Sequence, residues 1–135
     1  MYMLDTNICI FLINNKHPEI ARKITDIPSE KICVSTITQA ELEFGVAKSR
    51  KPAKNAQALA KFLSVIRVLD FDTRAAEVYG EIRVDLERRG ETIGYMDMLI
   101  AAHAKSSGYT IVTNNIREFD RIDGLQVENW VKESI

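Results

Sequence analysis

Met1-Tyr2-Met3-Leu4-Asp5-Thr6-Asn7 opens the chain, and this stretch decides the fold. Residues 1–4 are a short apolar run, which we expect to form a buried strand. Asp5 follows directly, and Thr6 and Asn7 offer side chains that can cap a helix beginning at Ile8. A strand that passes straight into a helix is typical of α/β proteins, whose ligands bind beyond the carboxyl ends of the strands. Asp5 therefore stands where a parallel sheet would place a functional side chain.

Further along the chain, short apolar strands alternate with helical patterns. We expect strands at residues 1–4, 31–35, 68–71, 109–113 and 125–127, and helices at residues 8–13, 18–26, 37–48, 52–66 and 95–107. A further helix should carry the apolar pattern of residues 76–86, with residues 72–73 as its cap and Gly90 as its stop. Such alternation predicts a parallel sheet covered by helices on both faces. The sequence holds no internal repeat and no linker rich in proline, glycine or serine. We therefore predict one α/β domain over residues 1–135, with a central, mostly parallel sheet.

Three carboxylates fall at apolar places in this pattern. Asp5 ends the first strand, Glu41 lies in the apolar helical pattern of residues 37–44, and Asp97 shares a helical face with Ile100 and Ala104. Buried carboxylates rarely persist unless they are paired or bind a metal. Because strand ends meet at one edge of a parallel sheet, we expect these side chains to converge there, together with Thr113 at the end of the fourth strand.

Gathered carboxylates repel one another, so at least one of them should have a raised pKa unless a cation compensates. Hard oxygen ligands suit Mg²⁺ or Mn²⁺, which can orient a phosphodiester and lower the pKa of a bound water. Asn115 could add a neutral oxygen ligand. Thr6 and Thr113 could hold carboxylates or metal-bound water by hydrogen bonds.

Each of these residues also has a simpler interpretation when it is taken alone. Asp5 could only cap the helix that follows it, and Asp97 could only favour the positive end of its helix. Glu41 could be an exposed residue or the partner of a lysine. Residues 114–115 alone would be a turn, and His103 is expected to be a satisfied helix histidine. Only the joint pattern favours a site.

Composition narrows the class of protein. Of 135 residues, 46% are hydrophobic and 27% charged, as in an ordinary globular domain, and no apolar stretch is long enough to span a bilayer. No secretory signal opens the sequence, so we expect a cytoplasmic protein. Cys9 and Cys33 lie in apolar runs and are expected to be reduced core thiols. The net charge of −1 does not by itself indicate a nucleic-acid-binding protein. The basic segments 48–54 and 83–89 are expected to be solvated helix faces, or to contact phosphates around the acidic site if that site exists.

The order of these motifs resembles PIN domains, and in particular the VapC toxins of bacterial toxin–antitoxin pairs. The resemblance covers nearly the whole chain. Four segments carry it in order: 3–7, 35–42, 93–104 and 111–119.

The resemblance implies a three-layer α/β/α PIN fold and a Mg²⁺- or Mn²⁺-dependent endoribonuclease that cuts RNA, with transfer RNA, in particular the initiator, as the expected substrate. It implies a toxin inhibited by a cognate VapB-type antitoxin, whose C-terminal segment would lie over the acidic groove. A homodimer is expected, with operator DNA reached only through the antitoxin and no membrane partner. The implied catalytic residues are Asp5, Glu41, Asp97 and Asn115, the first three as metal ligands, with Thr6, Asn7, Thr113 and Glu118 in support. Asn115 stands where PIN domains often have Asp, and Glu118 or Asp120 could compensate for the missing charge.

Two other functions remain open on the sequence. The chain could be a non-catalytic PIN-like interaction module in a repressor complex, although such a module could replace its carboxylates with apolar residues at little cost. A phosphoryl-transfer enzyme with Asp5 as nucleophile usually needs a second nearby Asp and a lysine for the phosphate. Residues 5–9 supply neither.

Overall fold

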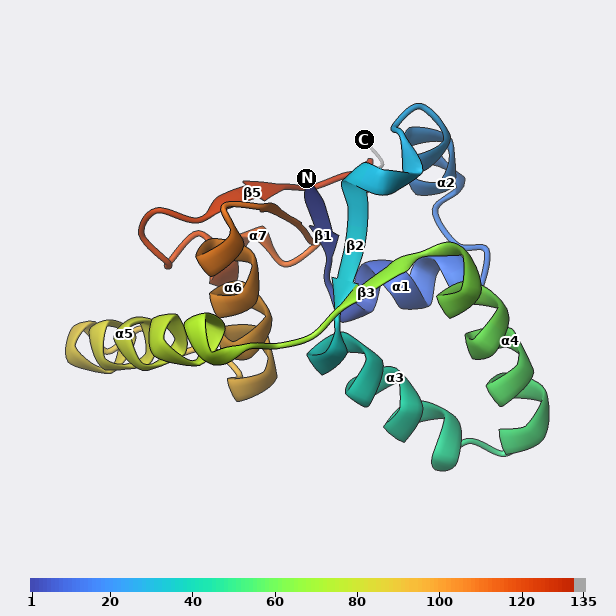
Figure 1. The fold of residues 1–135 in the computed structure, drawn as a ribbon, viewed down its shortest axis with the longest axis horizontal. Coiled ribbons are helices and arrows are strands. Elements are labelled where there is room, and N and C mark those ends of the chain that lie inside the picture. The colour runs from blue at the N-terminus through green and yellow to red at the C-terminus, as the bar shows by residue number, and fades with distance from the viewer. Residues whose placement is uncertain (133–135) are drawn as a thin grey trace.

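The computed structural model describes residues 1–132, which form a parallel sheet between helices (Figure 1). Within these residues the strands are β1 (Tyr2–Leu4), β2 (Ile32–Ser35), β3 (Arg67–Leu69), β4 (Thr110–Val112) and β5 (Gln126–Glu128). The helices are α1 (Thr6–Ile13), α2 (Pro18–Thr25), α3 (Thr36–Ala47), α4 (Pro52–Val65), α5 (Thr73–Arg89), α6 (Tyr95–Ser107) and α7 (Ile116–Phe119), with a 3₁₀ turn η1 at Ser29–Lys31.

The sheet has the strand order β3-β2-β1-β4-β5, and every pairing in it is parallel. The expected parallel α/β sheet is therefore confirmed. The first strand lies at the centre, with β2 on one side and β4 on the other. The strand order reverses at β1, because the chain builds β2 and β3 on one side of it and β4 and β5 on the other. Since all strands are parallel, the segments that follow β1, β2 and β4 leave the sheet at one edge. This is the place where open α/β sheets bind ligands.

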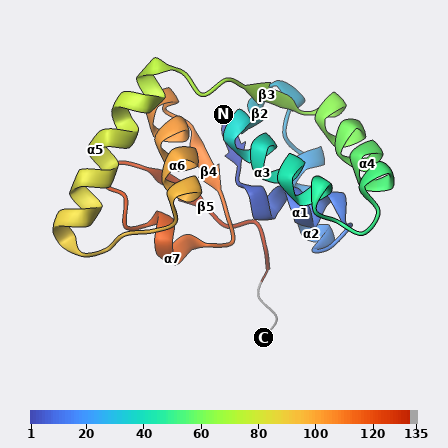
Figure 2. The same ribbon diagram turned by 90° about the horizontal axis from the view of Figure 1, so that it is seen from below.

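The two faces of the sheet are covered by different helices (Figure 2). Because side chains alternate along a strand, Met3, Cys33 and Ile111 pack with α5, α6 and α7, whereas Leu4 and Val112 pack with α1 to α4. The result is a three-layer α/β/α arrangement. The expected burial of both thiols is confirmed, since Cys9 and Cys33 are fully buried and free.

Local capping chemistry sets several helix boundaries. Ser35 caps α3 and Asp72 caps α5, each by accepting a hydrogen bond from a backbone N–H of the first turn. Gly90 and Gly108 end α5 and α6 with φ of 67° and 71°, a conformation that favours glycine.

One capping prediction was wrong. Asp5, rather than Thr6 or Asn7, caps α1, because its backbone is still extended while its Oδ1 accepts the Ile8 N–H at 2.9 Å. Thr6 already belongs to the helix.

Two short elements were not predicted: η1 and α7. Both are too short to show a helical period in the sequence. Among the described residues, no helix has the length and apolar character needed to cross a membrane.

Candidate active site

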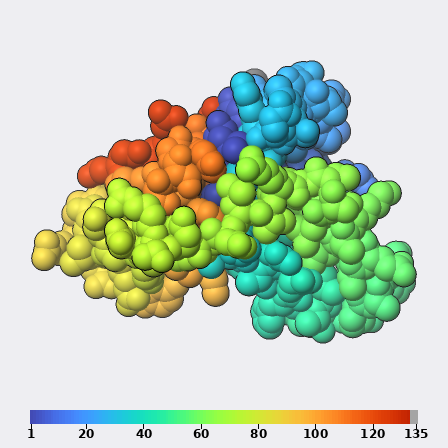
Figure 3. All heavy atoms as spheres, viewed as in Figure 1, coloured from blue at the N-terminus to red at the C-terminus, as the bar shows by residue number. Residues whose placement is uncertain are grey.

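The candidate site lies at the carboxyl edge of the sheet, where β1 and β4 end. The surface is notched at this edge between α6 and α3 (Figure 3). Asp5 follows β1, and Thr113 follows β4. The backbone N–H of Asp5 donates to the carbonyl of Val112 at 3.0 Å, which fixes the two strand ends side by side.

Asp5 is the most enclosed of the acidic residues, with 3% of its surface exposed. Its two carboxylate oxygens have different donors: Oδ1 accepts the Ile8 N–H at 2.9 Å and Oδ2 accepts the Thr113 hydroxyl at 2.5 Å. Helix capping and membership of a site, which were alternatives on the sequence, are therefore both properties of Asp5. The two bonds orient the carboxylate without help from a ligand.

Thr113 connects Asp5 to the next segment of the chain. It is fully buried, donates its hydroxyl to Asp5 and accepts the backbone N–H of Asn115 at 2.8 Å. The loop after β4 is thus held against the strand end. This role agrees with the expectation that Thr113 supports the site by hydrogen bonding.

A second threonine holds Glu41. The Thr6 hydroxyl donates to Glu41 Oε1 at 2.6 Å and lies 3.4 Å from the hydroxyl of Thr38. Thr38 is fully buried one turn before Glu41 on α3 and was not predicted as a site residue. Its spacing of three residues from Glu41 could have indicated this shared helical face. The neighbouring Glu43 is exposed, as expected.

Asp97 lies in the first turn of α6, near the positive end of that helix. A Cβ added to Gly94 would lie 3.7 Å from Asp97 Oδ2, so the carboxylate folds back over the start of the helix. Glu118, in α7, lies near enough to repel it. Glu118 Oε2 is buried without a hydrogen-bond partner, which is costly for a carboxylate oxygen.

The expected electrostatic strain is present. Burial raises the pKa of Asp5 to about 6, with further raising by the charges of Asp97 and Glu41, against the lowering effect of the bonds from Thr113 and Ile8. Burial also raises the pKa of Asp97, followed by the charges of Glu41 and Glu118. The three predicted carboxylates, with Glu118 as a fourth, therefore share one electrostatic environment.

The donor set suits a hard divalent cation, because it consists of carboxylates with hydroxyls behind them. The Glu118 oxygen without a hydrogen-bond partner also fits a cation, because a bound cation would satisfy that oxygen. Within residues 1–132, however, no three histidine, cysteine or acidic side chains converge closely enough to form a ready metal site. Binding of a cation would therefore involve rotation of the less restrained side chains, those of Asp97 and Glu118.

The remaining predicted residues lie around this group. Asn115 is partly buried at the start of α7, and its contact with the site runs through its backbone N–H. Asn7 is exposed on α1. His103 is buried with Nδ1 at 2.8 Å from Ser35 Oγ, and burial lowers its pKa, so it is the satisfied helix histidine that was expected.

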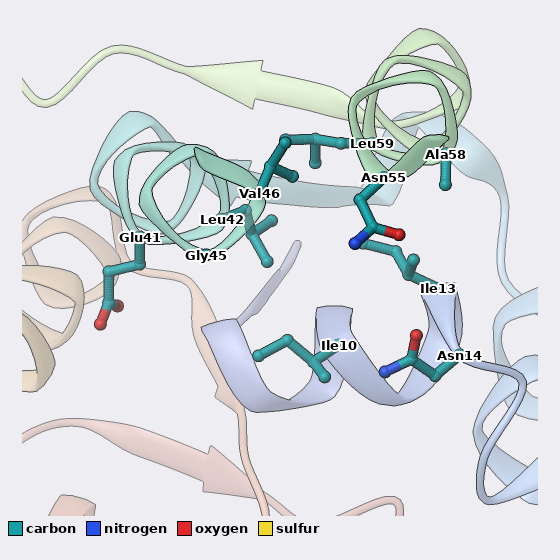
Figure 4. Close-up of a pocket in the computed structure, with 10 residues that line it drawn as sticks. All are labelled: Ile10, Ile13, Asn14, Glu41, Leu42, Gly45, Val46, Asn55, Ala58 and Leu59. Carbon is teal, nitrogen blue, oxygen red and sulfur yellow. The ribbon is translucent and has the colours of Figure 1, made fainter. Parts of the chain in front are cut away.

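A largely apolar pocket of about 230 Å³ adjoins the acidic group (Figure 4). It lies between α1, α3 and α4, and Glu41 stands at one end with its carboxylate turned away from the apolar side chains. The apolar lining includes Ile10, Ile13, Leu42, Val46 and Leu59.

Residues 2–125 match the family described as PIN domain. The chain is 46% identical over 129 residues to the tRNA(fMet)-specific endonuclease VapC of Salmonella typhimurium, covering 96% of this chain and 97% of that protein. The chain belongs to the VapC family of PIN-domain proteins. It is also 46% identical over 134 residues to ribonuclease VapC2 of Rickettsia felis, covering 98% of this chain and 99% of that protein.

Solved structures agree with this assignment. The crystal structure of DNA-bound VapBC from Salmonella typhimurium contains a chain that matches with a TM-score of 0.90 at 46% identity, covering 96% of this chain and 97% of that chain. The expected PIN family is confirmed, and with it the ribonuclease class to which the named VapC relatives belong. The acidic edge of the sheet is accordingly the candidate active site of a VapC-family ribonuclease.

Proposed function

We propose that the chain is the toxin of a type II toxin–antitoxin pair and acts as a Mg²⁺- or Mn²⁺-dependent endoribonuclease on transfer RNA. The observation that carries this proposal is the group of Asp5, Glu41, Asp97 and Glu118 at one sheet edge. Burial, and after it the charges of the neighbouring carboxylates, raises the pKa values of Asp5 and Asp97, and one Glu118 oxygen is left without a partner. A divalent cation would relieve both.

The proposed division of work follows from how each side chain is held. Asp5, Glu41 and Asp97 would hold the cation, with Glu118 in preference to Asn115 as the fourth oxygen donor. Asp5 is oriented by the Ile8 N–H and the Thr113 hydroxyl, and Glu41 by the Thr6 hydroxyl. When bound, the cation supplies charge neutralisation and activation of water for attack on phosphorus. Orientation by fixed hydrogen bonds lowers the reorganisation needed for reaction.

The proposed substrate class comes from the VapC of Salmonella typhimurium, whose name specifies the initiator transfer RNA. At 46% identity over nearly the full length of both chains, the same class is the first to test for this protein. Cytoplasmic location and a homodimer are part of the same proposal.

The proposed antitoxin would be of the VapB type. Solved complexes with matching chains are named VapBC and are bound to DNA, one of them to a fragment of the promoter. We place the antitoxin's C-terminal segment along the pocket of Figure 4, because an apolar surface there leads directly to Glu41. Operator DNA would be reached through the antitoxin.

The cleavage assay uses purified transfer RNAs with Mg²⁺, Mn²⁺ or a chelator. The parent should cut only with metal, and Asp97→Asn and Glu41→Gln should lose activity. Glu43→Gln is the matched control, since Glu43 is exposed beside Glu41. Equal cutting by Asp97→Asn and the parent would end the proposal.

The non-catalytic module is the remaining alternative, and it makes the opposite prediction. Calorimetric titration with Mn²⁺ should give binding to the parent and none to Asp97→Asn if the chain is an enzyme. Absence of metal binding, with intact binding to an antitoxin, would favour the module.

A further inference from the structure

Two exposed side chains lie beyond Glu41, those of Phe44 on α3 and of Lys48, the residue that caps the end of α3. Phe44 is 66% exposed, and the Lys48 ammonium lies 5.0 Å from the centre of its ring. A largely exposed aromatic ring presents a flat apolar face on which another ring can stack. The neighbouring lysine makes this ring part of a surface that is both aromatic and cationic.

Helical geometry places both side chains on the Glu41 side of α3. At about 100° per residue, Phe44 and Lys48 lie within about 60° of Glu41 around the helix axis. At about 1.5 Å per residue, they follow it by roughly 4.5 Å and 10 Å along the axis. They therefore form a path that leads away from the acidic group along the same helix.

The charges nearby distinguish this surface from the other basic region. Arg74, Arg83 and Arg89 on α5 are each paired with a carboxylate of α5 or the turn after it. Among residues 1–132, no carboxylate lies within ion-pair distance of the exposed cations where α3 passes into α4. These cations are Lys48, Arg50, Lys51 and Lys54. Within the described chain, ion pairs therefore hold three of the four arginines of α5, Arg88 being the exception, but none of the four cations of the α3–α4 surface.

We propose that Phe44 and Lys48 bind the single-stranded RNA next to the bond that is cut, Phe44 by stacking on an unpaired base and Lys48 by contact with a phosphate. Aromatic stacking together with cations along the backbone is how proteins hold single strands without reading their sequence. The inference rests on the proposed function, and it adds positioning residues that lie outside the acidic group.

Binding can be measured without cleavage, with a fluorescent unstructured RNA oligonucleotide and the full chain in the presence of a chelator. Phe44→Ala should weaken binding about tenfold, and Phe44→Trp should retain it. Lys48→Ala should reduce the dependence of log K on log salt by about 0.7, the loss of one phosphate contact. Val65→Ala and Lys61→Ala, at exposed positions of α4, are the matched controls and should bind as the parent does.

The cleavage assay adds a readout that a folding defect would not give. With Mg²⁺ or Mn²⁺ present, Phe44→Ala should raise KM with kcat unchanged. Equal RNA binding by Phe44→Ala and the parent would overturn the inference. So would a change in sedimentation alone, which would mark the surface as a contact between copies of the chain.

The two proposals fail in different ways. Cleavage that requires Asp97 but is indifferent to Phe44 would leave the proposed function standing and remove this inference. RNA binding that depends on Phe44, without any cleavage by the parent, would remove the proposed function and leave only the RNA-binding role of Phe44 standing. A parent that neither binds nor cuts RNA would remove both.

Discussion

The two sides of the acidic group are built differently. On the strand side, Asp5 is buried and each of its oxygens accepts a hydrogen bond, one of them from the fully buried Thr113. On the helix side, Asp97 is partly exposed and Glu118 has a buried oxygen without a partner. The strand side is therefore complete without a ligand, whereas the helix side is left to be completed by one. In the proposed metal-bound protein, the rigid half would orient the site and the adaptable half would adjust to the cation.

The largest expected effect concerns metal binding by the helix side. Asp97→Asn should weaken Mn²⁺ binding by at least about 100-fold, because it removes a charged ligand while the neighbouring Glu118 already serves as a separate donor in the proposed site. Circular dichroism should show an unchanged fold, since Asp97 makes no cap on which α6 depends. Calorimetric titration measures the affinity, and retained binding would contradict the division between the two sides.

The strand side should dominate the pH dependence of the metal-free protein. Burial raises the pKa of Asp5 to about 6 from an ordinary 3.8, so the folded state holds a proton that the unfolded chain has lost between these values. The free energy of unfolding should therefore be highest near pH 4, fall as the pH rises to about 6, and stay lower above it, by up to about 3 kcal/mol.

Asp5→Asn isolates this effect. The buried His103, whose pKa is lowered, acts in the opposite direction, and Asp97, whose pKa burial raises, acts in the same direction, but both residues are common to the two proteins. Urea unfolding between pH 4 and pH 7 should show the fall in the parent and a much flatter profile in Asp5→Asn. If the unfolding free energies of the two proteins changed with pH in the same way, the pKa of Asp5 would not be raised in the folded state.

A smaller effect compares the two candidates for the fourth oxygen donor. Glu118→Gln should weaken Mn²⁺ binding about tenfold, because it removes a charge beside Asp97. Asn115→Ala should change it less than about twofold, since Asn115 contacts the site through its backbone N–H. Titration of both variants decides between them, and the opposite ranking would make Asn115 the ligand.

The smallest effect tests how firmly the strand side is held. Thr113→Val removes the donor to Asp5 and the acceptor for Asn115, and should cost about 1 to 2 kcal/mol of unfolding free energy. Thr6→Val is the comparison, because Thr6 is only partly buried and should cost less than about 1 kcal/mol. Thermal or urea denaturation ranks the two, and equal costs would argue against a rigid strand side.

Much of the fold could be predicted from the sequence because its signals are local. The helix at residues 95–107 was predicted with the bounds that α6 has, since an apolar face precedes Gly108. The strands were found to within two residues because each is a short apolar run between turn or cap residues. The helix α7 was not predicted, because four residues are too few to show a helical period. The residues before it, 114–115, have the sequence of a plain turn.

The site was predictable in its members more than in its contacts. Asp5, Glu41 and Asp97 stood out as charges at apolar positions, and the structure brings their charges together. The sequence offered Asp5 and its neighbours Thr6 and Asn7 alike as caps of α1, because a sequence does not show where the extended backbone ends. The burial of Glu118 depends on how α7 packs beside α6, which no local pattern encodes.

The capping hydrogen bond that Asp5 accepts from the Ile8 N–H has a consequence for selection experiments. If the chain is the toxin that we propose, survivors of a growth-inhibition selection that are altered at Asp97 should accumulate as intact, folded protein. Those altered at Asp5 by residues that cannot cap should lose about 1 kcal/mol at the start of α1 and be present at lower abundance. Loss of the proposed toxicity by substitution of Asp5 is thus coupled to faster turnover of the protein. Loss by substitution of Asp97 leaves an inactive, folded protein that can still bind the antitoxin.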